Sequence, residues 1–393
     1  MVFLRKKNLL VKQQSGFRNK RGTSDNLFFF TQKVSESLCK GKKVCSIFFD
    51  ISKAFDKVWH AGLLFKLDRL GIPRYLIKFI QSFLRNRYCR IKMKNTMGDL
   101  IPIQCGVPQG SVLGPILFLV FINDIPLMDL KHISYSSLFA DDLATFFIFN
   151  KKRSITSKMN MYLESLVEWL FKWRLKMNAK KCCYTIFSKN GNKNSICFNL
   201  KLKDGLIPYN AKPVFLGVTF DEFLCFNEHF NNLRLRALKK LNIIKILRHR
   251  SWGLSCLTLK SVYNALVGSI FGYSFFTVAN VSAQNLNKIQ IVQNRAIRCI
   301  FRLDWNSLTH ELTKISGVLS IRNRFIQLGC RCITKSIKYN FNTGTLIQEY
   351  LCSISSIKRK GGTSTPLCVI YPYIALVFAL WVFICVSNLC LIL

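Results

Sequence analysis

The chain has 393 residues, half of them hydrophobic, so it is long enough for two or three domains and its composition argues against wholesale disorder. It carries 58 lysines and arginines against 19 aspartates and glutamates, a formal net charge of +39. A charge of this sign attracts polyanions, so nucleic acid is the first partner to consider, with an anionic membrane surface as the alternative.

The basic residues are concentrated in two stretches. Residues 1–24 hold seven lysines and arginines and no acid, and residues 229–360 hold 21 against only three acids. The sixteen cysteines are scattered, many of them in apolar runs, and no Cys-x-x-Cys pair occurs. This pattern predicts neither a zinc site nor a disulfide framework, and we expect reduced thiols in the core of an intracellular protein.

Apolar runs and helical periodicity predict the following elements in the first third of the chain. They are a buried strand over 43–51, a helix over 53–70 that Gly71 ends, a helix over 73–85 with Pro73 in its first turn, a hairpin over 88–104, and an apolar helix over 111–123. Asp56 is expected to serve the dipole of its helix rather than chemistry.

The rest of the chain predicts fewer strands and more helix. The expected elements are two strands over 134–149 broken at residues 140–142, a helix over 155–177, strands over 183–187 and 214–219, and basic helices from 227 to about 350. Trp59, Trp169 and Trp173 are expected in the core.

Two adjacent acids, Asp141 and Asp142, stand at the strand break in an apolar setting, and Asp50 ends another apolar strand. Paired carboxylates there are unfavourable unless cations neutralise them, and Mg²⁺ takes such hard oxygen ligands. If the strands are neighbours, the three acids can hold two cations roughly 3.5–4 Å apart, as in phosphoryl-transfer enzymes. The alternative at this point is that Asp141-Asp142 is only a polar turn.

Six segments, in order, decide between these interpretations. They are Gln14–Arg18 (QSGFR), Phe48–Asp56 (FFDISKAFD), Gln104–Pro115 (QCGVPQGSVLGP), Phe139–Asp142 (FADD), Lys176–Lys181 (KMNAKK) and Phe215–Val218 (FLGV). From about residue 14 to 229 the chain resembles the reverse transcriptases of non-LTR (LINE-type, jockey-like) retrotransposons. In that family these segments look like the second fingers block, polymerase motifs A, B, C and D, and the primer grip.

The resemblance implies an α+β fold, a right-hand polymerase with an antiparallel palm sheet packed with helices, partial fingers and a helical thumb. It implies an RNA-directed DNA polymerase that adds dNTPs to a DNA primer on an RNA template. Two Mg²⁺ (or Mn²⁺) ions would be held by Asp50, Asp141 and the Ile51 carbonyl, with Asp142 supporting them or the primer terminus. Lys181 would donate a proton to pyrophosphate.

The resemblance also assigns residues around the nucleotide and primer. Arg18 would meet the triphosphate, and Phe55 would act as a sugar gate that excludes ribonucleotides. The Pro108-Gln109-Gly110 turn would lie along the nucleotide and template. Phe215, Leu216 and Gly217 would form the primer grip.

The expected domains follow from the motif positions and the composition. They are partial fingers (1–42), palm with residual fingers (43–226), a basic helical thumb or connection (227–360), a linker (361–366) and a hydrophobic tail (367–393). Because the chain starts close to the second fingers block, we expect an N-terminally truncated relative, with its polymerase body in the nucleus or cytoplasm.

Two other functions stay open. One is a catalytically inactive remnant that only binds nucleic acid through its basic thumb. The other is a tail-anchored membrane protein, since residues 367–393 are 27 uncharged residues preceded by Lys358-Arg359-Lys360. We expect the tail to be an unpacked helix that any catalysis can do without, with membrane contact through it.

Overall fold

The computed structural model describes residues 2–128, 130, 133–189, 197–202 and 205–339. They divide into two compact units. Unit 1 comprises Met1–Asn26, Lys43–Ile186 and Asn190–Asn210, and unit 2 comprises Leu27–Lys42, Phe187–Lys189 and Ala211–Leu393. The predicted linker and hydrophobic tail, and with them the expected membrane span, lie outside the described residues.

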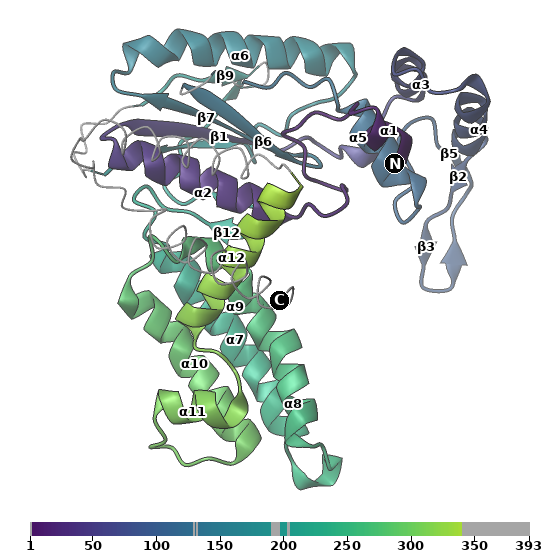
Figure 1. The fold of residues 1–393 in the computed structure, drawn as a ribbon. Coiled ribbons are helices and arrows are strands. Elements are labelled where there is room, and N and C mark those ends of the chain that lie inside the picture. The colour runs from purple at the N-terminus through teal and green to yellow at the C-terminus, as the bar shows by residue number, and fades with distance from the viewer. Residues whose placement is uncertain (1, 129, 131–132, 190–196, 203–204, 340–393) are drawn as a thin grey trace, which may run out of the picture. The chain divides into compact units, whose positions relative to one another are not determined.

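A four-stranded sheet organises unit 1 (Figure 1). Its strands, in spatial order, are β6 (Ser134–Phe139), β7 (Asp142–Phe149), β1 (Lys43–Phe49) and β8 (Cys183–Phe187). Both β6 and β1 pair antiparallel with β7. The two apolar runs therefore become neighbours, as their sequences predicted, and both strands are buried along almost their whole length.

Helix α6 (Arg153–Lys172) lies along one face of this sheet (Figure 1). Its buried Tyr162 hydroxyl is 3.0 Å from the Thr145 hydroxyl of β7 and donates to the Pro126 carbonyl at 3.3 Å. Trp169 and Trp173 are buried, as expected, and Trp59 is half-buried. The helix ends five residues before the predicted Met177, because residues 175–178 leave it to pair with the end of β1.

The predicted helix over 53–70 is wrong in its first turns. The chain forms a 3₁₀ turn, η1 (Phe55–Lys57), and the helix α3 starts only at His60 and runs to Arg69. The carbonyls of Phe55 and Val58 accept hydrogen bonds from Val107 and Gly106, at 2.9 and 2.8 Å. These distant partners replace the helical ones, so the segment stays open.

The next predicted elements are confirmed. Helix α4 (Arg74–Leu84) starts after Pro73, and the hairpin pairs β2 (Tyr88–Cys89) with β5 (Ile101–Pro102) and β3 (Lys92–Met93) with β4 (Thr96–Met97). The remaining elements of unit 1 are α1 (Val2–Lys6), the buried α5 (Leu113–Phe121), β9 (Lys201–Leu202) and β10 (Gly205–Leu206).

Unit 2 is mainly helical. Its helices are most of α2 (Thr23–Cys39), α7 (Asn227–Leu247), α8 (Cys256–Tyr263), α9 (Ser269–Gly272), α10 (Ala283–Phe301), α11 (Thr309–Ser316) and α12 (Ile321–Lys338), with short turns η2 (Arg250–Trp252), η3 (Asn264–Gly268) and η4 (Phe275–Thr277). Helix α10 packs along α7, and buried phenylalanine rings fill the unit around Phe30, Phe220 and Phe226.

Two expectations in this part of the chain need correction. The single strand over 214–219 is a hairpin of β11 (Val214–Phe215) and β12 (Val218–Thr219), because Leu216 and Gly217 both have positive φ, 47° and 76°. The thiols are free in the described residues, yet Cys39, Cys89, Cys197, Cys225 and Cys256 are exposed rather than in the core. Among the described helices, none is both long and apolar enough to cross a bilayer.

A buried histidine ties the α7 helix to this hairpin. His229 Nδ1 accepts a 3.4 Å hydrogen bond from the Thr219 amide, and its Nε2 donates to the Ser274 hydroxyl at 2.8 Å. Burial, helped by the charge of Arg236, lowers the pKa of His229 to about 4. The imidazole is therefore neutral in the folded protein at pH values where an unfolded histidine is charged.

We predict that unit 2 loses stability as the pH falls from about 6.5 to about 4. In that window His229 is protonated in the unfolded chain but not in the folded chain. The free energy of unfolding therefore falls by up to about 3 kcal/mol, by the usual conversion of a pKa shift into free energy. Denaturant unfolding across this range should show the slope in the wild type and in His249→Gln, which removes an exposed histidine. An undiminished slope in His229→Gln would contradict the assignment.

Candidate active site

Three carboxylates meet at one edge of the unit 1 sheet. Strand β1 ends at Phe49, which stands opposite Leu143, so Asp50 follows next to the start of β7 at Asp142. Asp141 lies in the tight turn between β6 and β7, where Phe139 pairs with Asp142. The antiparallel register therefore brings the three acids to the same edge of the sheet.

The three acids repel one another in a partly buried place. Burial, then the charges of Asp141 and Asp50, raise the pKa of Asp142 to about 6. Burial and the Asp50 charge also raise the pKa of Asp141, against a backbone hydrogen bond that lowers it. Lys181 Nζ stands 3.9 Å from Asp50 Oδ1, but its side chain is 68% exposed, so this ion pair offsets little of the repulsion.

The donor set fits a hard divalent cation. Mg²⁺ is bound in proteins by one or two carboxylates together with waters and substrate phosphates, rather than by a closed protein cage. In the described part of the chain, no group of three His, Cys, Asp or Glu side chains is arranged so that it could hold a metal ion by itself. The residues that could hold it are Asp50, Asp141, Asp142 and the backbone of Ile51.

The turn that carries the acids is strained and is held from a distance. Ala140 has φ = 54°, a left-handed conformation that costs a non-glycine residue about 1 kcal/mol. The Gln14 side chain, 1% exposed, accepts from the Ala140 amide at 2.9 Å and donates to the Ala140 carbonyl at 3.2 Å. Both polar groups of the strained residue are thereby satisfied by one side-chain amide.

The segment around Gln14 pairs with the edge of β6. The Ser15 amide donates to the Leu138 carbonyl at 2.9 Å, and the Leu138 amide donates to the Gln13 carbonyl at 3.2 Å. A Cβ on Gly16 would lie 2.3 Å from the Ala140 nitrogen, so only glycine fits there. The sequence marked this segment but gave Gln14 no role, because nothing local separates Gln14 from Gln13.

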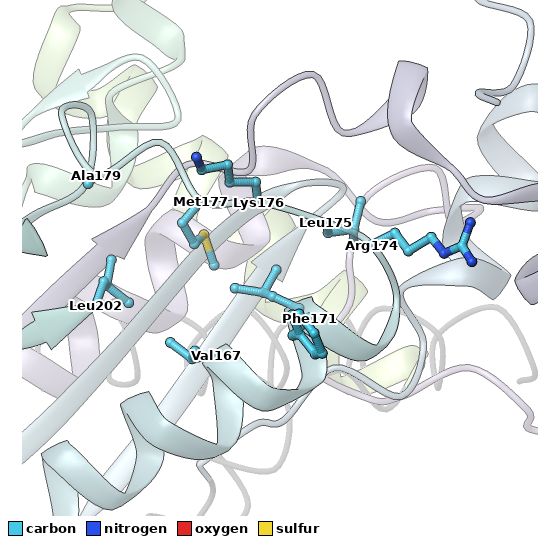
Figure 2. Close-up of a pocket in the computed structure, with 9 residues that line it drawn as sticks. Val167, Phe171, Arg174, Leu175, Lys176, Met177, Ala179 and Leu202 are labelled. Carbon is cyan, nitrogen blue, oxygen red and sulfur yellow. The ribbon is translucent and has the colours of Figure 1, made fainter. Parts of the chain in front are cut away.

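Asp50 is held from its other side by the segment after α6. The Ser52 amide donates to the Lys176 carbonyl at 2.9 Å, and the Asn178 amide donates to the Asp50 carbonyl at 2.8 Å. The Asp50 amide itself donates to the Cys182 sulfur at 3.4 Å. Behind this segment lies a cavity of about 390 Å³, into which Met177 points (Figure 2).

The predicted nucleotide-binding residues Phe55 and Gln109 are held by contacts between residues 48–56, which resemble motif A, and residues 104–118, which begin with the segment that resembles motif B. The Phe55 ring stacks on Phe118 of α5, with centroids 4.1 Å apart. Gln109 donates to the Asp56 carboxylate at 2.9 Å, so Asp56 has a structural role, and because α3 begins only at His60 it lies outside the first turn of that helix. Gly110 has φ = 82° with open space around it, so its turn conformation requires glycine there.

Arg18 bonds to backbone carbonyls of its own segment, and the primer-grip residues belong to the other unit. The Arg18 guanidinium donates to the carbonyls of Val11 (2.8 Å) and Gln14 (3.2 Å), and burial lowers its pKa. Phe215, Leu216 and Gly217 belong to unit 2, where the Tyr273 hydroxyl donates to the Leu216 carbonyl at 2.8 Å. Pro108, by contrast, directly precedes Gln109 and accepts from the Ser111 hydroxyl at 2.7 Å.

Known proteins resemble this chain over more than half of its length. Residues 2–220 match the family described as reverse transcriptase (RNA-dependent DNA polymerase). The chain is 30% identical over 315 residues to the RNA-directed DNA polymerase from mobile element jockey of Drosophila melanogaster, covering 78% of this chain and 33% of that protein. It is 27% identical to the probable RNA-directed DNA polymerase from transposon BS of the same species, covering 75% and 33%.

The chain thus spans about a third of the length of these relatives. Among solved structures it is similar to telomerase from Candida tropicalis with the TWJ fragment of telomeric RNA, at 16% identity and a TM-score of 0.41, covering 89% of this chain and 55% of that one.

We predict that Gln14→Ala lowers the free energy of unfolding of unit 1 by about 1–3 kcal/mol, because it leaves the Ala140 amide and carbonyl without partners. Gln13→Ala, one residue away, is the matched control and should cost less. Adding Ala140→Gly to Gln14→Ala should recover part of the loss, since glycine adopts positive φ freely. If denaturant unfolding shows equal losses of unfolding free energy for the Gln14 and Gln13 variants, Gln14 does not stabilise the Ala140 turn.

Proposed function

The chain belongs to the reverse transcriptase family, in the group carried by non-LTR mobile elements, and from this we propose that it adds deoxynucleotides to the 3′-hydroxyl of a primer on an RNA template. The observation that carries the proposal is the convergence of Asp50, Asp141 and Asp142 at one sheet edge. Because the chain spans a third of its relatives, the activity of this chain itself is part of the proposal.

In the proposed reaction Asp50, Asp141 and the Ile51 carbonyl would hold two divalent ions, Mg²⁺ or Mn²⁺, and Asp142 would support them. Bound metal would lower the pKa of the primer hydroxyl and neutralise the pyrophosphate leaving group. Lys181, whose Nζ lies 3.9 Å from Asp50 Oδ1, would give a proton to that leaving group. The hydrogen bonds of Gln14 to Ala140 hold the turn that carries Asp141 and Asp142, and residues 176–178 hold the backbone at Asp50.

The nucleotide would lie between the A and B segments. Phe55, braced by Phe118, blocks a 2′-hydroxyl, while Gln109, held by Asp56, meets the base pair together with Pro108 and Gly110. Arg18 would reach the triphosphate only by leaving the carbonyls of Val11 and Gln14.

The domain assignment in this proposal follows the motifs. Residues 1–42 form partial fingers, 43–226 the palm and 227–360 the thumb, with the 215–217 turn gripping the primer. Tyr273, which holds the Leu216 carbonyl, would position that grip.

A second candidate is a remnant that binds nucleic acid without catalysis. Its specific support is the row of exposed cations on α7 and α12, including Arg234, Arg236, Lys239, Arg322 and Arg331. Such surfaces bind phosphates through counterion release, which needs no metal site.

Primer extension distinguishes the two candidates. The wild type should extend a DNA primer on RNA with Mg²⁺, and Asp141→Asn with Asp142→Asn should reduce the rate by at least about a hundredfold, because the metals lose their anionic ligands. The double variant should keep salt-sensitive RNA binding, and Asp68→Asn, on the exposed face of α3, should extend normally. A wild type that binds but never extends would favour the remnant.

We further predict that Phe55→Val relaxes selection against ribonucleotides, lowering the ratio of kcat/KM for dNTP over rNTP by roughly tenfold or more. The smaller side chain removes the clash with the 2′-hydroxyl, and Phe118 still packs beside it. Phe17→Val changes a ring that only touches Phe55 edge-on, at 5.9 Å, and serves as the control. An unchanged ratio in Phe55→Val would remove the gate assignment.

A further inference from the structure

Residues 74–101, which we call the α4 arm, form an outlying part of unit 1 made of α4 and the hairpin that follows it (Figure 1). The arm has a one-sided charge. It contains seven lysines and arginines, namely Arg74, Lys78, Arg85, Arg87, Arg90, Lys92 and Lys94, and its single acid is Asp99. In the described part of the chain no carboxylate pairs with any of the seven.

The arm also exposes aromatic rings that the fold does not use. Tyr75 is 70% exposed, Phe79 is 59% exposed and Tyr88 is 58% exposed. Helix α4 packs on the core with Ile77, Ile80 and neighbouring apolar residues, so the exposed rings belong to its other face.

Rings and cations alternate along that face. Tyr75 and Phe79 are four residues apart and form one row on the helix surface, and Arg74 and Lys78 form the adjacent row. The hairpin continues the pattern with Tyr88, Arg90 and the fully exposed stretch that follows.

We propose that the α4 arm binds single-stranded nucleic acid, with bases stacked on its rings and phosphates held by its cations. Surfaces for unpaired strands combine these two features, because every base has a face that an aromatic ring can cover. A duplex keeps its bases stacked on each other, so it could use the cations but not the rings.

The chemistry favours a nucleic acid over an anionic membrane. A basic amphipathic helix can lie on a membrane surface, so α4 by itself does not decide between the two partners. The hairpin after it exposes both of its faces, and its open strand edges carry polar backbone groups that a bilayer interior would leave unsatisfied.

The arm leads directly into the segment with the nucleotide residues. The Ile103 amide donates to the Arg87 carbonyl at 2.8 Å, and Gly106 and Val107 then bond to the A segment just before Pro108. We therefore assign the bound strand as the unpaired RNA template. This identity rests on the proposed function, whereas single-strand binding does not.

The test measures binding of a labelled, unstructured RNA and of a blunt RNA duplex of equal length to the full chain without metal or nucleotide. Tyr75→Ala with Phe79→Ala should weaken single-strand binding by about tenfold or more and leave duplex binding nearly unchanged. Arg74→Ala with Lys78→Ala should weaken both and reduce the salt dependence. Phe171→Ala, another exposed ring of unit 1, is the matched control and should bind like the wild type.

Three results would overturn the proposal. The ring variant could bind single strands as tightly as Phe171→Ala does, or it could lose single strand and duplex equally. Vesicles of phosphatidylserine and phosphatidylcholine could be bound by the wild type and released by the ring variant while RNA binding stays constant, which would make the arm a membrane contact. The binding test measures no catalysis. A chain that is inactive in primer extension can therefore still bind single strands through the α4 arm, and an active chain can still show no such binding.

Discussion

One side-chain amide carries the geometry of the acidic site. Asp141 and Asp142 can face Asp50 only if the chain reverses sharply at Ala140, and this reversal leaves a non-glycine residue at positive φ. Gln14, 126 residues earlier, hydrogen-bonds to both the amide and the carbonyl of Ala140. These two bonds stabilise the strained turn. Without that pairing, strain and charge repulsion would act together to open the turn.

Elsewhere in the site, too, a residue from one segment is held in place by a residue from another. Three of the residues proposed to meet metal or nucleotide are held by a partner from another segment: Asp50 by residues 176–178, Phe55 by Phe118, and Gln109 by Asp56. The open 55–58 segment exists because Gly106 and Val107 bond to it. Segments 14–16, 50–58, 106–110, 140–142 and 176–178 therefore interlock, and a change in one shifts the side chains presented by the others.

This interlocking separates what the sequence could predict from what it could not. Strands β1, β6 and β7 follow from apolar runs that end in acids, and α4 follows from its period and from Pro73, because these signals are local. The interruption at 55–58, the early end of α6 and the role of Gln14 all depend on hydrogen bonds to residues far along the chain. No periodicity encodes such bonds, and they are concentrated around the acids.

The scarcity of acids has a structural meaning of its own. Outside the site, several of the few carboxylates serve local structure: Asp221 accepts from the amides of Phe223, Cys225 and Phe226, Glu311 accepts from the Leu308 amide, and Asp124 pairs with the buried Lys66. Burial lowers the pKa of Lys66 to about 8, and the pairing of its ammonium group with the Asp124 carboxylate makes the two charges largely cancel at a distance. Exposed cations on α4, α7 and α12 contribute to the chain's excess of +39, and a polyanion can reach them there.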